Sequence, residues 1–150
     1  MDDGSKVPDV TVTIDDAPVS LASLGAPLVV YFYPKDDTAG CTTEAKDFTA
    51  LANDFAAAGV TVVGVSKDTP AAHAKFMAKH ALAVQLASDV VGAACEAFGV
   101  WVEKAMYGRK YMGIERATFL FGADGTLAKT WRKVRVAGHA DAVLATAKAL

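Results

Sequence analysis

The sequence predicts an α/β fold in which a central mixed sheet is flanked by helices on both faces. Two short runs, Pro27–Pro34 and Val60–Val65, are almost wholly apolar and rich in β-branched and aromatic residues. Such runs are typical of parallel strands that are buried on both faces. A helical pattern follows each run, as expected where parallel strands are connected through helices.

The first predicted helix follows a polar loop, residues 35–40, and carries apolar side chains on one face at Phe48, Leu51, Ala52 and Phe55. Gly59 stands where this helix is expected to end. The pair Thr69-Pro70 opens a second helix that runs to about Leu82. Threonine suits the capping position and proline the first helical position.

The remaining elements are short. Residues 84–87 are expected to form a third strand, and the helix after it carries four residues on one face, Val91, Ala94, Cys95 and Phe98. Residues 117–122 and 126–136 are expected to pair as a hairpin that turns at Asp124-Gly125, before a last helix from about His139. Residues 10–21 supply a further hairpin. This order, with strand–strand–helix after alternating strands and helices, is the thioredoxin-like arrangement.

Length and composition indicate one globular domain over residues 1–150, in which residues 1–6 are expected to be flexible. These first residues are acidic and polar with no apolar stretch behind them, so no signal peptide is expected. No uncharged apolar run approaches the ~18 residues of a membrane span. We therefore expect a cytoplasmic protein that does not bind membranes.

The formal net charge of −2 argues against a general nucleic-acid binder. Residues 101–150 nevertheless hold 9 Lys and Arg against 4 Asp and Glu, a net +5, whereas residues 1–100 hold 6 against 13, a net −7. The basic excess gathers around Trp131, in Lys129, Arg132, Lys133 and Arg135. No nucleic-acid-binding motif accompanies it, so a solvated strand face is the better interpretation and no nucleic-acid partner is expected.

Cys41 is the residue whose position indicates chemistry. It follows a buried strand, a polar loop and Gly40, and lies in the first turn of the predicted helix on its core-facing side. The positive end of the helix dipole and the free N–H groups of that turn favour the thiolate, the nucleophilic form of cysteine. The carboxyl ends of strands are also where open α/β sheets build their sites. The alternative is a small buried apolar residue with no chemical role.

A dithiol of the type Cys-x-x-Cys is excluded, because position 44 is Glu44. Pro34, Thr38 and Cys41 instead match Pro-x-x-x-Thr-x-x-Cys, the motif of the peroxiredoxins. Four segments together resemble the bacterioferritin comigratory protein (PrxQ) subfamily of that family, namely residues 31–44, 95–101, 106–116 and 118–120. The resemblance extends from about Val7 to the end of the chain.

The resemblance implies a role for each matching residue. Cys41 would be the peroxidatic nucleophile, which attacks a peroxide oxygen and becomes a sulfenic acid. Thr38 would hold its hydroxyl between thiolate and peroxide, and Pro34 would shield the thiolate from water. Arg116, oriented by Glu44, would stabilise the thiolate and the charge developing on the peroxide oxygens. Roles without peroxide chemistry stay open. Thr38 could cap the helix and Pro34 could end the strand. Arg116 could be a surface charge, and Glu44 could be a first-turn carboxylate on the helix dipole.

Two departures from the subfamily pattern bear on the catalytic cycle. Ala39 stands where the subfamily usually has proline, which removes no chemical group. Lys46 stands where many members carry a resolving cysteine, and the other known resolving position falls near Phe76. Cys95 is the only other cysteine, and its apolar helix face favours a buried core thiol. A one-cysteine cycle with an external thiol is therefore expected, with a two-cysteine cycle through Cys95 as the alternative.

The resemblance thus predicts a cofactor-free thiol peroxidase that reduces hydrogen peroxide and small organic hydroperoxides. Its reductant would be thioredoxin, glutaredoxin or glutathione, and the protein would be a monomer or a weak dimer. His73, His80 and His139 lack metal-ligand spacing, so no metal site is expected. Two rival classes remain: a redox sensor in which Cys41 oxidises once and changes partner binding, and a thioredoxin-fold interaction module without chemistry.

Overall fold

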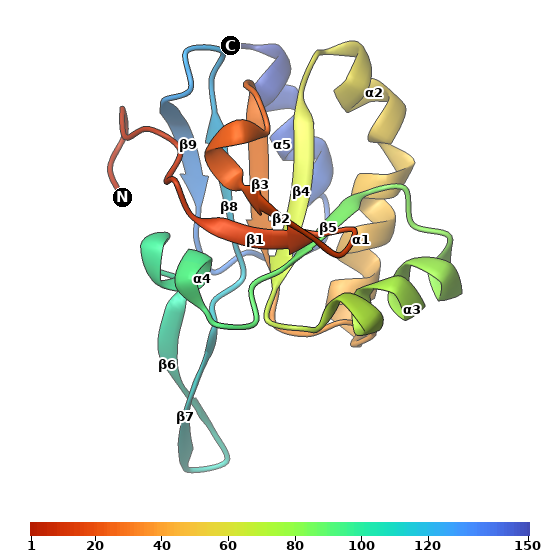
Figure 1. The fold of residues 1–150 in the computed structure, drawn as a ribbon, viewed down its shortest axis with the longest axis vertical. Coiled ribbons are helices and arrows are strands. Elements are labelled where there is room, and N and C mark those ends of the chain that lie inside the picture. The colour runs from red at the N-terminus through yellow and green to blue at the C-terminus, as the bar shows by residue number, and fades with distance from the viewer.

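A seven-stranded mixed sheet forms the centre of the computed structural model, which describes residues 1–150 (Figure 1). In the order β2-β1-β5-β4-β3-β8-β9, its strands are β1 (Thr11–Ile14), β2 (Ala17–Ser20), β3 (Leu28–Phe32), β4 (Thr61–Ser66), β5 (Gln85–Ser88), β8 (Ala117–Phe121) and β9 (Leu127–Trp131). Strands β3, β4 and β5 run parallel, whereas β8 is antiparallel to β3 and β1 is antiparallel to β5. The predicted α/β class and mixed sheet are confirmed.

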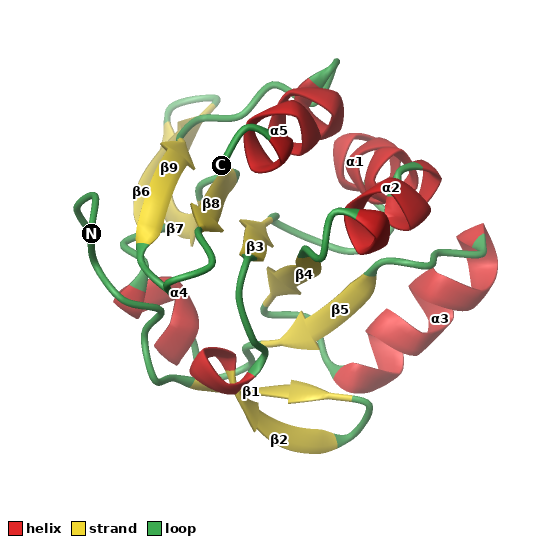
Figure 2. Cartoon of the chain, turned by 90° about the horizontal axis from the view of Figure 1, so that it is seen from above, coloured by secondary structure: helices red, strands yellow, loops and turns green.

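The helices lie on both faces of this sheet. They are α1 (Ala39–Ala50), α2 (Ala52–Ala57), α3 (Pro70–His80), α4 (Ala93–Ala97) and α5 (His139–Lys148), with a short 3-10 helix η1 (Leu21–Ser23). Seen from above, α1, α2, α3 and α5 cover one face, and α4 and η1 lie on the other (Figure 2). None of the helices combines the length and the apolar character that a bilayer crossing requires.

The sheet separates two hydrophobic cores because successive side chains of β3 point to opposite faces. Val30 and Phe32 enter the core under α4, where the ring of Phe32 packs against Phe98 at 4.9 Å. Val29 and Tyr31 enter the core under α1 and α5. All five residues of β3 are buried, as its continuous apolar run predicts.

The helix after β3 differs from the single helix that the apolar spacing predicts. It consists of α1 and α2, separated at Leu51, whose backbone leaves the helical region at φ −99° and ψ 6°. Phe48 and Phe55 still reach the same core, with ring centroids 5.9 Å apart. An apolar periodicity is preserved across such a break, so it does not reveal the break.

Two further predictions need correction. Val91 precedes α4 and is exposed, so it does not belong to the buried face of that helix. Strand β9 ends at Trp131 instead of continuing to residue 136. Within the first six residues, whose flexibility stays a prediction, Gly4 and Ser5 form backbone hydrogen bonds with Leu127. These bonds attach that part of the segment to the edge of the sheet.

The sequence pattern did not reveal a second, two-stranded sheet, β6 (Trp101–Met106) paired with β7 (Arg109–Ile114). This hairpin extends away from the body of the molecule (Figure 1). Tyr107 and Gly108 form its turn, both with positive φ, and Tyr107 is almost fully exposed. Strand β7 ends just before Glu115 and Arg116, so the hairpin leads directly into the segment that carries Arg116.

Candidate active site

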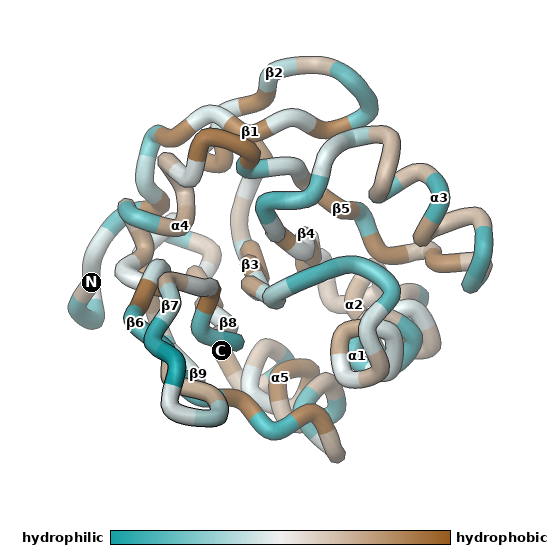
Figure 3. The backbone as a smooth tube through the Cα atoms, turned by 90° about the horizontal axis from the view of Figure 1, so that it is seen from below, coloured by the Kyte–Doolittle hydropathy of each residue, from teal (hydrophilic) through white to brown (hydrophobic).

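Cys41 lies where the connection from β3 enters α1. This connection, Pro34–Thr38, follows the carboxyl end of β3 and is strongly hydrophilic (Figure 3). Helix α1 begins at Ala39, so Cys41 is its third residue and stands in the first turn, as predicted. Its side chain is 2% exposed and belongs to the same core as Ala45. The thiol therefore faces the protein beneath the positive end of the helix dipole.

Arg116 reaches Cys41 because of the register between two strands. Ala117 pairs with Phe32, so the residue before β8 stands at the edge where β3 ends. From there Nη2 of Arg116 donates to Sγ of Cys41 at 3.4 Å, and Nη1 donates to Oε1 of Glu44 at 2.7 Å. The Arg116 side chain is 17% exposed. One planar cation thus bridges the sulfur and a carboxylate, an arrangement that suits the forked geometry of arginine.

Gly40 makes room for this guanidinium. A Cβ atom at position 40 would lie 3.2 Å from Nη2 of Arg116. That distance is tighter than ordinary van der Waals contact, so any other residue would displace the cation or the helix start. The glycine before Cys41 therefore has a steric reason in addition to its place at the start of the helix.

Glu44 lies one helical turn after Cys41 and is 1% exposed. Burial raises the pKa of its carboxyl group to about 7, although the charge and hydrogen bond of Arg116 act in the opposite direction. Its second oxygen, Oε2, has no hydrogen-bond partner. Arg116 is the hydrogen-bond donor to this buried carboxyl group. Such a contact is expected of a residue that orients the arginine.

Thr38 occupies the N-cap position of α1, but its hydroxyl does not cap the helix. It donates instead to the backbone carbonyl of Lys35 at 2.8 Å. The capping role left open by the sequence is therefore wrong for the side chain. Because this hydroxyl donates its proton within the connection, its lone pairs are available to accept a hydrogen bond. Pro34, two residues after β3 ends, is exposed at the start of the same connection.

Tyr31 is a neighbour of the site that the sequence analysis missed. It is buried in β3, its ring stacks on Phe48 at 4.5 Å, and its hydroxyl has no hydrogen-bond partner. Burial raises the pKa of Tyr31, and the negative charges of Glu44 and Cys41 raise it further. The Tyr31 phenol therefore stays neutral beside Glu44 and Cys41. Because Tyr31 stands within an unbroken apolar strand, the sequence around it carries no signal that distinguishes it from other core residues.

Cys95 belongs to the other core. It is completely buried in α4, on the opposite side of the sheet from Cys41. The carboxylate of Asp89 accepts hydrogen bonds from the backbone N–H groups of Ala94 and Cys95, which caps α4. Burial, followed by the hydrogen bond and charge of Asp89, raises the pKa of the Cys95 thiol far above its ordinary range. Both cysteines are free.

The structure thus brings Cys41, Arg116 and Glu44 into direct contact, with Thr38 and Pro34 in the connection that leads to them. It places Cys95 behind the sheet. A buried thiol with a cation on its sulfur can act as a nucleophile toward a small electrophile.

Comparisons with known proteins agree with this arrangement. The model of the AhpC/TSA family matches residues 4–130. Peroxiredoxin Bcp of Xanthomonas campestris is 54% identical over 128 residues, which cover 85% of this chain and 80% of that protein. Peroxiredoxin Bcp of Bacillus subtilis is 45% identical and covers 97% of this chain and 94% of its own. A solved structure of the Xanthomonas campestris bacterioferritin comigratory protein, described for its alkyl peroxide reduction activity, superposes with a TM-score of 0.90 at 45% identity, covering 99% and 98% of the two chains.

Proposed function

Since this chain belongs to the AhpC/TSA family and is a thiol-dependent peroxidase of the peroxiredoxin type, we propose that Cys41 is its peroxidatic nucleophile. The observation that carries the proposal is the guanidinium of Arg116, which contacts Sγ of Cys41 and the carboxylate of Glu44 at the same time. Hydrogen peroxide and small organic hydroperoxides are the substrates. The alkyl peroxide reduction described for the Xanthomonas relative supports the organic part of this assignment.

In the first step the thiolate of Cys41 attacks one peroxide oxygen and the O–O bond breaks. Sulfur gains that oxygen and becomes a sulfenic acid, while the second oxygen leaves with the electron pair of the broken bond and takes a proton to form water or an alcohol. Negative charge moves from sulfur to the leaving oxygen, and Arg116 stands where it can stabilise both. The hydroxyl of Thr38 accepts a hydrogen bond from the bound peroxide. Pro34 limits the access of water.

The second half of the cycle uses an external thiol. Attack of that thiol on the sulfenic acid releases water and leaves a mixed disulfide, which a second thiol reduces to regenerate Cys41. Position 46 holds an exposed lysine, and Cys95 lies behind the sheet, so neither supplies a resolving thiol near Cys41. Thioredoxin, glutaredoxin or glutathione would serve as reductant. These thiols are found in the cytoplasm, where we propose that the protein acts as a monomer or a weak dimer.

Mass spectrometry of the protein treated with one equivalent of hydrogen peroxide tests the proposal. With a sulfenic-acid trap present, we expect one adduct, on Cys41. Trapping on Cys95 alone, or no oxidation of either thiol, would contradict the assignment. Addition of a thiol and excess peroxide separates an enzyme from a sensor, because a sensor consumes a single equivalent and then stops.

A further inference from the structure

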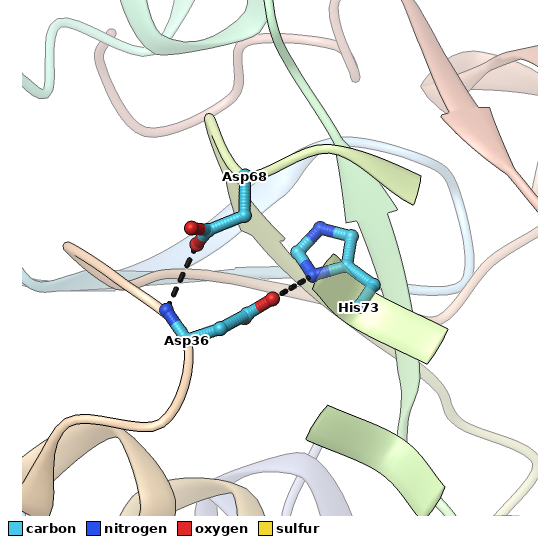
Figure 4. Close-up of side chains that lie close together, drawn as sticks. All are labelled: Asp36, Asp68 and His73. Carbon is cyan, nitrogen blue, oxygen red and sulfur yellow. Dashed lines mark hydrogen bonds and ion pairs between the residues drawn. The ribbon is translucent and has the colours of Figure 1, made fainter. Parts of the chain in front are cut away.

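Asp36, Asp68 and His73 form a partly buried cluster, which does not include Cys41, Arg116 or Glu44 (Figure 4). Asp36 is part of the connection between β3 and α1, whereas His73 lies in α3, 37 residues further along the chain. Oδ2 of Asp36 is 2.6 Å from Nδ1 of His73, and the two side chains are 6% and 5% exposed. The other oxygen of Asp36 accepts a hydrogen bond from the hydroxyl of Tyr33 at 2.6 Å.

His73 is held on both sides of its ring. While Nδ1 faces Asp36, Nε2 faces the backbone carbonyl of Ala87 in β5 at 3.0 Å. These two contacts hold the ring in one orientation, and the hydroxyl of Tyr33 lies 3.4 Å from Nδ1 as well. The contact between Asp36 and His73 is therefore short and buried, and the same ring attaches α3 to β5.

The spacing of these atoms fits a hydrogen-bonded pair better than a metal site, the other use of two carboxylates and a histidine. Nitrogen and oxygen ligands of one zinc ion lie about 2.1 Å from the metal, so two adjacent ligands stand on the order of 3 Å apart. The 2.6 Å between Asp36 and His73 fits a shared proton instead. Oδ2 of Asp68 already accepts from the hydroxyl of Ser66 at 2.6 Å and from the backbone N–H of Asp36 at 2.8 Å.

The contact between Asp36 and His73 holds the connection that leads to Cys41. The same connection is also attached to α3 through Asp37, which contacts Lys79 and His80. Next to the pair, the carbonyl of Lys35 accepts the hydrogen bond of the Thr38 hydroxyl at 2.8 Å. The carbonyl that orients this hydroxyl therefore lies in the same short connection that α3 holds through Asp36 and Asp37.

We propose that Asp36 and His73 are positioning residues for the peroxide reaction, an inference that rests on the function proposed above. The buried pair fixes the Pro34–Thr38 connection, and thereby the Thr38 hydroxyl, relative to the sulfur of Cys41. It touches neither the sulfur nor Arg116. Its loss slows attack on a peroxide, which must be aligned, and leaves almost unchanged the attack on an electrophile that needs only an accessible thiolate.

The test compares two reactions of Cys41 in a Cys95→Ser background. One is single-turnover oxidation by hydrogen peroxide, and the other is alkylation by iodoacetamide, which needs no hydroxyl to align it. In His73→Gln, which removes the ring that contacts Asp36 and Ala87, we expect oxidation to slow by about 10- to 100-fold, because a displacement near 1 Å has effects of that size. Alkylation is expected to change by less than about threefold. His80→Gln is the matched control on the same helix and connection; because Asp37 is 43% exposed and keeps its contact with Lys79, this change should alter neither rate appreciably.

Tyr33→Phe provides the test if His73→Gln does not fold, because it removes one hydrogen bond to Asp36 and keeps the ring. We expect a smaller slowing, again confined to the peroxide reaction. Equal slowing of both reactions, or rates equal to those of the unmodified protein, would overturn the positioning role. If the unmodified protein is alkylated normally but does not react with peroxide, the proposed function has failed, and this inference with it.

Discussion

The buried carboxyl group of Glu44 should make the stability of the protein depend on pH. Its pKa rises from the ordinary 4.5 to about 7, first through burial, with Arg116 opposing the rise. At ~1.4 kcal/mol for each tenfold change in acidity, the difference corresponds to about 3 kcal/mol. Between pH 4.5 and 7 the unfolded chain has released this proton while the folded protein still holds it. The free energy of unfolding therefore falls as pH rises through that window.

Glu44→Gln isolates this effect because glutamine stays neutral. Urea unfolding of both proteins under reducing conditions at pH 5 and pH 8 gives the difference between their unfolding free energies at each pH. We expect that difference to move by about 2.5 kcal/mol in favour of Glu44→Gln at the higher pH, because pH 5 already lies above the pKa of the unfolded chain. Other groups, such as His139, titrate alike in both proteins and cancel. A difference that stays the same at both pH values, or moves toward the unmodified protein, would refute the reasoning.

Three other substitutions follow from contacts in and around the site. Gly40→Ala places a Cβ 3.2 Å from Nη2 of Arg116, so kcat/KM for peroxide should fall roughly tenfold. Urea unfolding should show no loss of stability, because alanine favours the helix. Unchanged kcat/KM would count against the steric role of Gly40. Gly64→Ala places a Cβ 2.5 Å from the ring of Tyr31, and we expect it to lower the free energy of unfolding by about 1–3 kcal/mol in the same assay. Lys46→Cys puts a thiol ~7.5 Å along the helix from Cys41, beyond disulfide reach unless the first turn unwinds. On oxidation we expect peptide mapping to show a disulfide between Cys41 and the introduced thiol, together with lost helix signal in circular dichroism, and a disulfide without loss of helix would contradict this.

Much of the fold could be predicted because its central strands are buried on both faces. The runs that became β3 and β4, and the Thr69-Pro70 start of α3, carry local signals that tertiary structure did not override. The hairpin β6–β7 was missed because every residue of β7 before Ile114 is exposed or only half-buried, which leaves no alternation to detect. The dipeptide Tyr107-Gly108, which forms the turn with two positive φ angles, was the one local signal of this hairpin.

The site was predictable to different depths. The position of Cys41 after a buried strand and a glycine could be read from its own neighbours along the chain. The roles of Arg116 and Glu44 came from resemblance, because 72 residues separate the two partners and only the register of β3 with β8 brings them together. The pair Asp36–His73 and the buried Tyr31 hydroxyl depend in the same way on how α3 and α1 pack, which a single sequence does not state.

Steady-state consumption of hydroperoxide with an added thiol, compared in Cys95→Ser and Cys41→Ser, tests the one-cysteine account most directly. Cys41 lies in the active-site core and Cys95 behind the sheet. We expect Cys95→Ser to keep turnover close to that of the unmodified protein and Cys41→Ser to abolish it. Loss of turnover in Cys95→Ser, together with a rapid and quantitative Cys41–Cys95 disulfide in the unmodified protein, would contradict the account and make Cys95 the resolving thiol.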